Sequence, residues 1–146
     1  MSGQQRVFEK KKQLMARQKS EYPTELELEI LKILWKDTSL PVRDVRARLE
    51  TQAGRALAHS SVITVLNIMH RKGYLKRRKV GNLFLFSPKV EKRNVAGGMT
   101  GDLVTRVFDG SPSAMMLNLL ETSDIDSEEM TELRKLINRK AKEQND

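Results

Sequence analysis

The sequence predicts a mainly α fold with a small β-hairpin wing, a winged helix-turn-helix followed by a C-terminal helical dimerisation domain. Three observations support this prediction. Apolar residues recur at helical spacing between residues 25 and 71, an alternating segment follows over residues 74–86, and helical spacing returns between residues 103 and 141. A chain of 146 residues is long enough for one ordinary domain or two small ones. We therefore expect any second domain to complete its core across a subunit interface.

The composition is that of a globular, helix-rich protein without disulfides or thiolate metal sites. The chain is 38% hydrophobic and contains four Pro, eight Gly and no Cys. Its two histidines, His59 and His70, are too few for a metal site built from histidine, and we expect no cofactor. No apolar run approaches the roughly 20 residues of a membrane span, and no signal-peptide pattern is present. We therefore expect a cytoplasmic protein that does not bind membranes.

The positive charge of the chain is concentrated in two segments. The formal net charge is +8; residues 51–95 contribute ten Lys and Arg against one acidic residue. Residues 1–20 are also basic, whereas residues 96–146 are net acidic. A basic ordered module beside an acidic one suggests that the basic module binds a polyanion. The predicted division is a basic N-terminal arm over 1–20, a winged helix DNA-binding domain over 21–90 and a helical dimerisation domain over 91–146.

The predicted arm has no sustained apolar periodicity. Its basic residues include Lys10, Lys11 and Lys12. We expect it to be flexible, and two interpretations stay open, a segment that contacts phosphates and an extension without a role in binding.

The first two helices are marked by a start signal and by apolar spacing. Thr24 and Glu27 have the T-x-x-E spacing of a capping box, which predicts a helix over residues 25–36. After a polar break, residues 40–42 fit a short strand. The apolar face of a second helix is formed by Val42, Val45 and Leu49.

The third helix, predicted over residues 60–71 and ended by Gly73, has one apolar and one polar face. The apolar face is formed by Val62, Val65, Leu66 and Met69. Hydroxyls, an amide and a branched apolar side chain on the other side suit base edges in the major groove. The residues expected to read bases are Ser60, Ser61, Ile63, Thr64 and Asn67. An ordinary amphipathic surface helix would also show a polar face, so the segment that follows decides between the two interpretations.

The segment after the third helix is predicted to form a basic hairpin. The predicted strands are residues 74–79 and 83–86, with a turn over residues 80–82, and Ser87 and Pro88 end the second strand. Three helices followed by a basic hairpin is the winged helix arrangement. Successive strand residues face opposite ways, so alternate basic side chains are expected to touch phosphate while the others stay solvated. The residues expected to contact the DNA backbone are Arg71, Lys72, Lys76, Arg77, Arg78 and Lys79.

The C-terminal segment carries three apolar stripes at helical spacing, beyond a linker predicted around Gly97 and Gly98. The residues expected at a dimer interface are Leu103, Val107, Phe108, Met115, Met116, Leu119, Leu120, Met130, Leu133 and Ile137. Three short helices bury too little surface to be stable alone, so a second copy is expected to cover them. Packing against the winged helix of the same chain is the alternative. Asp126 and Glu129 have capping-box spacing at the start of the last helix.

Taken together, these segments resemble the penicillinase repressor (BlaI/MecI/CopY) family of winged helix transcriptional regulators. The resemblance covers residues 21–142 and rests on the opening at residues 24–35, the stretch Ser61-Val62-Ile63-Thr64-Val65-Leu66, and Arg71-Lys72-Gly73-Tyr74-Leu75 leading to Phe84-Leu85-Phe86-Ser87-Pro88. It implies dimers that repress genes such as β-lactamases from palindromic promoter sites. Copper-responsive relatives carry paired cysteines, which this chain lacks, so copper sensing is disfavoured.

The resemblance also bears on how repression ends. In well-known relatives a sensor-linked protease cuts an Asn-Phe bond, and the matching positions here are Ser111 and Pro112. A bond entering proline is a poor protease substrate, and these residues fit better as the N-cap and first residue of a helix. A sensor or protease is thus an implied partner, but not one that cuts this bond.

The predicted function is a DNA-binding transcriptional repressor that binds double-stranded DNA at a palindromic operator as a homodimer. The alternative is a winged helix that binds RNA or docks on a protein. The sequence offers no glycine-rich phosphate loop, nucleophile elbow or acid-base-metal cluster, so we predict that it is not an enzyme. The regulated gene and any small-molecule signal stay open.

Overall fold

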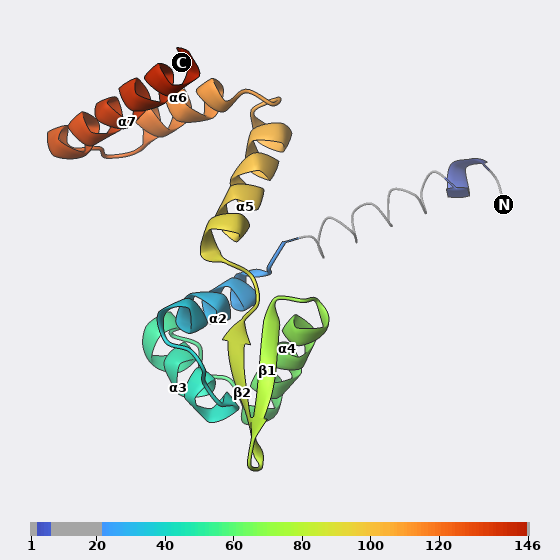
Figure 1. Cartoon of the computed structure of the whole chain (residues 1–146). Helices are drawn as coiled ribbons and strands as arrows, with labels where there is room; N and C mark the ends of the chain where they lie inside the picture. The colour runs from blue at the N-terminus through green and yellow to red at the C-terminus, as the bar shows by residue number, and fades with distance from the viewer. Residues whose placement is uncertain (1–2, 7–21, 146) are drawn as a thin grey trace. The chain divides into compact units, whose positions relative to one another are not determined.

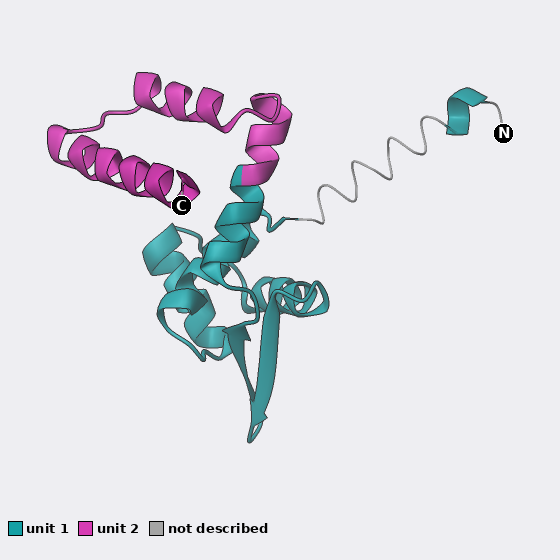
Figure 2. Cartoon of the chain, turned by 45° about the horizontal axis from the view of Figure 1, so that its top comes forward, with its two compact units in different colours: residues 1–100 teal, residues 101–146 magenta. Residues whose placement is uncertain are grey.

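The computed structural model describes residues 3–6 and 22–145 of the chain. Apart from residues 3–6, which are helical, the predicted basic arm lies outside the described residues. The chain divides into two compact units, residues 1–100 and residues 101–146 (Figure 2). Three helices and a hairpin follow one another in the first unit in the predicted order, and the second unit is helical (Figure 1). This confirms the predicted mainly α fold with a small β-hairpin wing and a helical C-terminal segment.

Helix α2, Glu25–Lys36, begins at the predicted capping box. The Thr24 hydroxyl accepts a hydrogen bond from the Glu27 backbone N–H at 3.2 Å, and the Glu27 carboxylate accepts one from the Thr24 N–H at 2.9 Å. Both bonds satisfy backbone donors that the first turn of a helix leaves without partners. The cap therefore sets where α2 starts, and the apolar face of α2 then enters the core.

Helix α3, Val42–Ala53, starts directly after Leu40 and Pro41, which leaves no room for the strand predicted over residues 40–42. Only Leu40 pairs, through an isolated antiparallel bridge to Phe86. Pro41 lacks an N–H group and is the N-cap of α3, so the extended segment ends after one bridging residue. The predicted strand is wrong in length, although its first residue is extended and bridged.

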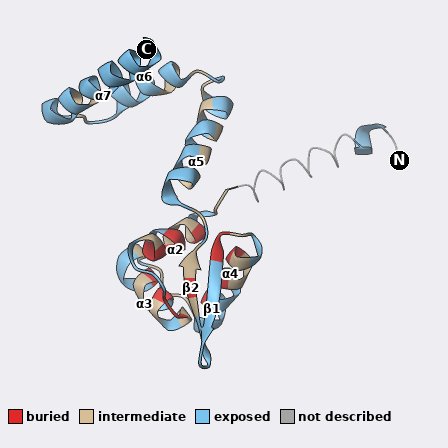
Figure 3. Ribbon diagram, in the orientation of Figure 1, coloured by how far each residue is buried: buried red, intermediate tan, exposed pale blue. Residues whose placement is uncertain are grey.

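Helix α4, His59–Arg71, packs its predicted apolar face into the single core of the first unit (Figure 3). The core consists of Ile30, Leu31, Ile33, Leu34, Leu40, Val45, Leu49, Val62, Leu66, Met69, Tyr74, Leu75 and Phe86. Val62, Leu66 and Met69 have no exposed surface. Burying one such side chain contributes about 1.5–3 kcal/mol. Together these three fix the rotation of α4 about its axis and hence which side chains point outward.

The end of α4 has the geometry of a Schellman motif, which leads the chain into the hairpin. Gly73 has a φ of +85°, and its N–H donates to the His70 carbonyl at 3.1 Å. The Tyr74 N–H donates to the Met69 carbonyl at 2.9 Å. The predicted terminating role of Gly73 is confirmed. Tyr74 belongs to this cap, and the strand begins one residue later than predicted.

The hairpin pairs β1, Leu75–Val80, with β2, Leu83–Pro88, in antiparallel register. The turn is shorter than predicted, because Val80 pairs with Leu83 and only residues 81 and 82 connect the strands. Gly81 has a φ of +60°, which a two-residue hairpin turn requires and which glycine adopts without strain. Pro88 closes β2 opposite Leu75 and does not interrupt the ladder, since a strand end needs no N–H donor there.

Helix α5, Lys92–Val107, follows the hairpin and contains the boundary between the two units. Gly97 and Gly98 lie inside this helix and not in the predicted linker. A glycine costs about 1 kcal/mol in a helix interior, which neighbouring residues can offset. At Gly98 the absence of a side chain has a use, since a Cβ there would lie 3.3 Å from the Tyr22 ring.

The second unit contains α6, Pro112–Thr122, and α7, Ser127–Asn145. Ser111 is the N-cap of α6, its hydroxyl accepting from the Ala114 N–H at 3.2 Å, and Pro112 is the first helical residue, as predicted. At the start of α7, the Asp126 carboxylate accepts from the Glu129 N–H at 2.8 Å. No residue of α5, α6 or α7 is buried within this single chain (Figure 3).

Candidate nucleic-acid interface

The outer face of α4 presents short polar side chains. Ser60, Ser61, Ile63 and Thr64 are exposed, and Asn67 is half-buried. The Thr64 hydroxyl donates to the Ser60 carbonyl at 2.9 Å, so its proton is committed to its own helix. Thr64 therefore offers outward its oxygen lone pairs and its methyl group. These suit an amino group on a base edge or a thymine methyl.

Asn67 is held by the hairpin. The Arg77 guanidinium donates from Nη1 to Asn67 Oδ1 at 3.1 Å. The same guanidinium lies over the Phe84 ring, with its central carbon 4.8 Å from the ring centroid. Arg77 pairs with Phe86 across the ladder, which places Phe84 two residues along on the same face of the hairpin. A residue of α4 and two residues of the hairpin thus form one connected cluster.

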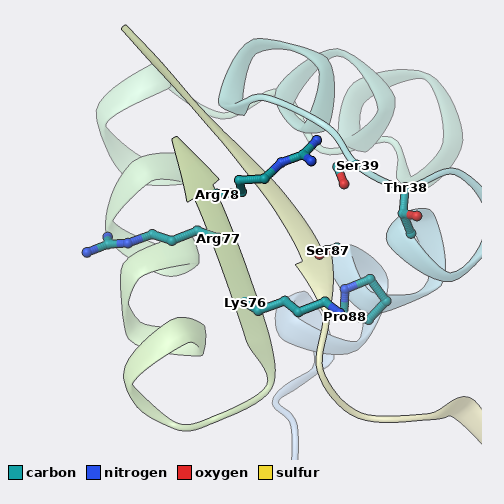
Figure 4. Close-up of a pocket in the computed structure, with 7 residues that line it drawn as sticks. All are labelled: Thr38, Ser39, Lys76, Arg77, Arg78, Ser87 and Pro88. Atoms are coloured by element: carbon teal, nitrogen blue, oxygen red, sulfur yellow. The ribbon is translucent and has the colours of Figure 1, made fainter. Parts of the chain in front are cut away.

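The four consecutive basic residues of β1 divide between the two faces of the hairpin. Arg77 points toward α4, whereas Lys76 and Arg78 extend to the opposite side (Figure 4). On that opposite side, a hollow of about 510 Å³ is lined by Thr38, Ser39, Lys76, Arg78, Ser87 and Pro88, and also by Arg77, whose side chain points away toward α4. Three of these residues carry hydroxyls, and none carries a carboxylate.

The groups that line this hollow keep their hydrogen-bonding capacity. Among residues 22–145, the side chains of Lys76 and Arg78 make no ion pair and no hydrogen bond, and the same holds for the three hydroxyls. Arg48 forms an ion pair with Asp37, which holds the loop that carries Thr38 and Ser39. Two cations and three hydroxyls converging on one concavity have the chemistry of an oxyanion site.

The other predicted backbone contacts differ in their surroundings. Arg71 and Lys79 are exposed and make no ion pair within the described part of the chain. Lys72 instead places its Nζ 3.1 Å from both carboxylate oxygens of Glu27, a residue with only 3% of its surface exposed. Lys72 therefore already has an intramolecular partner that ties the end of α4 to the start of α2.

The electrostatics of this surface follow from the sequence. Residues 51–90, which include α4 and the hairpin, contain no Asp or Glu. The carboxylates that form ion pairs with residues 51–90 come from α2: Glu25 and Glu29 pair with Arg55, and Glu27 pairs with Lys72. The surface formed by the outer face of α4 and the hairpin is therefore positive without internal neutralisation, which favours a polyanion.

Sequence reasoning missed the hydroxyls of the hollow and the partners of Arg77. The sequence shows Thr38 and Ser39 only as part of the polar break that precedes residue 40, and Ser87 only as the end of a strand. Strand alternation placed Lys76 and Arg78 on one face, but only the register set by a two-residue turn brings Lys76 opposite Ser87. The sequence holds one weak indication of the Arg77 contact, the aromatic Phe84 on a basic hairpin, because a cation can stack on an aromatic ring. Phe84 is 41% exposed in the structure.

The profile of the penicillinase repressor family matches residues 23–139 of the chain. The chain belongs to the penicillinase repressor family. It is 26% identical to the penicillinase repressor of Bacillus licheniformis over 78% of this chain and 88% of that protein. It is 23% identical to the methicillin resistance regulatory protein MecI of Mammaliicoccus sciuri over 78% and 91% of the two chains.

A solved structure of more distant sequence is similar in fold. The complex structure of hsRosR-S4 aligns with 86% of this chain and 96% of that chain, with 15% identity and a TM-score of 0.51. This likeness bears on the fold alone. Penicillinase repressors are transcriptional regulators and not enzymes. In residues 3–6 and 22–145, no helix is long and apolar enough to cross a lipid bilayer.

Proposed function

We propose that this penicillinase repressor family member binds a palindromic DNA operator as a homodimer, with α4 in the major groove. Its class, a DNA-binding transcriptional repressor, follows from the family. The observation that carries the finer proposal is the outward polar face of α4 beside a hairpin surface free of carboxylates. A major groove admits a helix and presents a distinct donor and acceptor pattern for each base pair.

The side chains on α4 divide the reading of bases among them. Asn67 has an amide that can pair bidentately with adenine, and Thr64 offers an acceptor and a methyl group. Ile63 is exposed beside them and supplies apolar contact for a thymine methyl. Ser60 and Ser61 lie in the first turn, where hydroxyls and backbone N–H groups also reach phosphates.

Phosphate contacts are assigned to the basic residues that have no carboxylate partner. The hollow at Lys76 and Arg78, with its three hydroxyls, has the chemistry of a backbone phosphate site. Arg71 and Lys79 are exposed and available for further contacts. Lys72 is left out of this set, because moving it to a phosphate would leave the buried Glu27 carboxylate without its cation.

The second copy in the proposal covers the helices of the C-terminal segment. Large apolar side chains of these helices are exposed in the single chain, namely Met99, Leu103, Val107, Met116, Leu117, Leu119, Leu120, Leu136 and Ile137. Monomeric soluble proteins rarely leave so many large apolar side chains uncovered on adjacent turns. Two-fold self-association covers such a face and places two copies of α4 on one duplex, which explains the expectation of a palindromic operator.

An unbiased selection of random duplexes by the full-length protein tests this function. The expected result is enrichment of one palindromic sequence with half-sites about one helical turn apart. Enrichment of a single, non-repeated site would contradict the dimer. Absence of any enriched duplex, with binding to RNA or to a protein instead, would overturn the proposal in favour of an adaptor.

Asn67→Ala is expected to lower the preference for operator over random DNA without weakening binding to random DNA. A lost bidentate base contact costs about 1–3 kcal/mol, so the preference should fall roughly 5- to 150-fold. Competition binding on operator and scrambled duplexes measures it. An equal loss on both duplexes would show that Asn67 does not read a base.

Lys76→Ala and Arg78→Ala are expected to weaken binding to every duplex by the same factor. Each lost phosphate contact should reduce the slope of log affinity against log salt by about 1. A titration of binding from low to high salt measures the slope, with Glu50→Ala, a change at an exposed position outside the proposed surface, as the control. A change in sequence preference without a change in slope would contradict the phosphate assignment.

We also expect that induction does not cut the bond between Ser111 and Pro112. Ser111 caps α6 and Pro112 is its first residue, so this bond lies in an ordered helix start and also lacks the N–H that a protease needs. Mass spectrometry of the repressor after induction in its native host would detect the fragments. A fragment ending at Ser111 would contradict the prediction, and intact repressor released from its promoter would support a signal that acts without this cleavage.

A further inference from the structure

We propose that Arg77 is a positioning residue for sequence recognition, which acts through Asn67 and not through a phosphate. The inference rests on the proposed function, because it assigns to Arg77 a part in the base reading that α4 performs. By sequence alone, strand alternation puts Arg77 on the face opposite Lys76 and Arg78 but does not show what Arg77 contacts. In the structure it is set apart by its face of the hairpin and by its two partners.

The first step is the position of the Arg77 guanidinium. Arg77 extends toward α4, while Lys76 and Arg78 extend to the opposite side of the strand (Figure 4). Its planar group rests over the Phe84 ring at 4.8 Å, which restricts the rotamers of a long side chain. The hairpin therefore holds the guanidinium N–H donors of Arg77 in a fixed position beside α4.

The second step is the hydrogen bond that these donors make. Arg77 Nη1 lies 3.1 Å from Asn67 Oδ1. Guanidinium groups only donate, so this contact requires the amide oxygen, and a rotated amide would turn its own N–H₂ donors toward Arg77. One orientation of the Asn67 amide is thereby stabilised over the other.

The third step concerns the hydrogen-bonding groups of the Asn67 amide that stay available for DNA. Arg77 uses one lone pair of Oδ1, and the second lone pair and both amide protons stay available. Bidentate pairing with adenine needs one acceptor and one donor from the same amide, so the contact with Arg77 is compatible with it. Because the orientation is set before binding, less side-chain freedom is lost on recognition.

A role in positioning and a role in phosphate binding make different predictions for the same variants. Arg77→Ala should reduce the preference for operator over random DNA by roughly 3- to 10-fold, the effect expected from releasing one ordered polar side chain. Arg77→Lys keeps the charge but loses the planar, ring-stacked fork, so it should show most of the same loss. Arg78→Ala, next to it on the other face, should weaken both duplexes equally and is the matched control.

A second variant removes the aromatic ring under the Arg77 guanidinium and leaves every hydrogen-bonding group in place. Phe84→Leu deletes the ring under the guanidinium, at a position that is 41% exposed and outside the core. It should relax the same base position in the enriched operator as Arg77→Ala, with a smaller effect. Thermal unfolding of each variant should match that of the unaltered protein, since these side chains lie outside the hydrophobic core.

The deciding experiment is a double-mutant cycle between Arg77→Ala and Asn67→Ala, read as operator preference in competition binding. The expected result is that Arg77→Ala has no further effect on preference once Asn67 is alanine. If Arg77→Ala weakens operator and random DNA equally, Arg77→Lys restores binding and the two losses add, Arg77 is a phosphate contact and the inference is overturned. If Asn67→Ala itself leaves the preference unchanged, the base-reading role of Asn67 in the proposed function has failed first.

Discussion

Replacing Met116 and Leu120 by aspartate is expected to produce a monomer whose operator affinity is about 10²- to 10⁴-fold lower. The two side chains lie one helical turn apart on α6 and are 57% and 46% exposed in the single chain. In a dimer they would be covered by the second copy, and two carboxylates at such an interface would be desolvated without cations. Loss of the second half-site then removes the gain in affinity that comes from joining two DNA-binding units.

The control adds a carboxylate on the other side of α6. Asn118→Asp should leave the dimer intact, because Asn118 is exposed, one turn from Glu121 and away from the middle of the stripe formed by Met115, Met116, Leu119 and Leu120. Sedimentation velocity at micromolar concentration separates monomer from dimer. Two outcomes would contradict the prediction: an unaltered protein that is monomeric yet binds palindromes tightly, or a double variant that stays dimeric.

The start of helix α2 was predictable because the capping box in the sequence agrees with the way the helix packs. The capping box at Thr24 fixes the first residue of α2, and the apolar spacing behind it matches the face that is buried. The buried side of α4 was predictable for the same reason, since Val62, Leu66 and Met69 recur at helical spacing.

What the sequence left open depends on pairing between distant segments. Glu27 was interpreted only as part of a cap, but its carboxylate also meets Lys72, a contact between residues 45 positions apart. The strand register depended on whether Val80 belonged to the turn, and that one residue decides which side chains face Ser87. The partner of Arg77 could not be predicted, because it requires the position of the hairpin relative to α4.

The glycines of the C-terminal half show the limit of local rules. Gly97 and Gly98 indicated a linker by propensity, yet both are helical, and Gly98 lies against Tyr22 at a distance that leaves little room for a side chain. By contrast, Ser111 and Pro112 were assigned correctly as a helix start, because a cap and a first-turn proline act within one turn of the chain.

Glu27→Ala is expected to lower the free energy of unfolding by about 2–4 kcal/mol, because this one carboxylate binds both the Thr24 backbone and Lys72. It accepts from the Thr24 N–H at 2.9 Å and places both oxygens 3.1 Å from Lys72 Nζ. It also acts on Tyr74, whose pKa is raised from 10.0, first by burial and second by the Glu27 carboxylate. Since folding raises this pKa, the unfolded chain loses the phenol proton first, and stability should decrease as the pH rises above 10.0.

Glu27→Gln separates these contributions, because its amide oxygen can still accept from Thr24 while the charge is gone. We expect a smaller loss of stability than for Glu27→Ala, and a lower pKa of Tyr74 that stays above 10.0 because burial is the larger cause. Urea unfolding measures the first and ultraviolet titration of tyrosine the second, with Tyr22→Phe as the background that isolates Tyr74. Equal stability of Glu27→Ala and the unaltered protein would show that the contact between α2 and the end of α4 does not stabilise the fold. In that case Lys72 would be free to contact DNA, and Lys72→Ala would weaken binding to all duplexes as Arg78→Ala does.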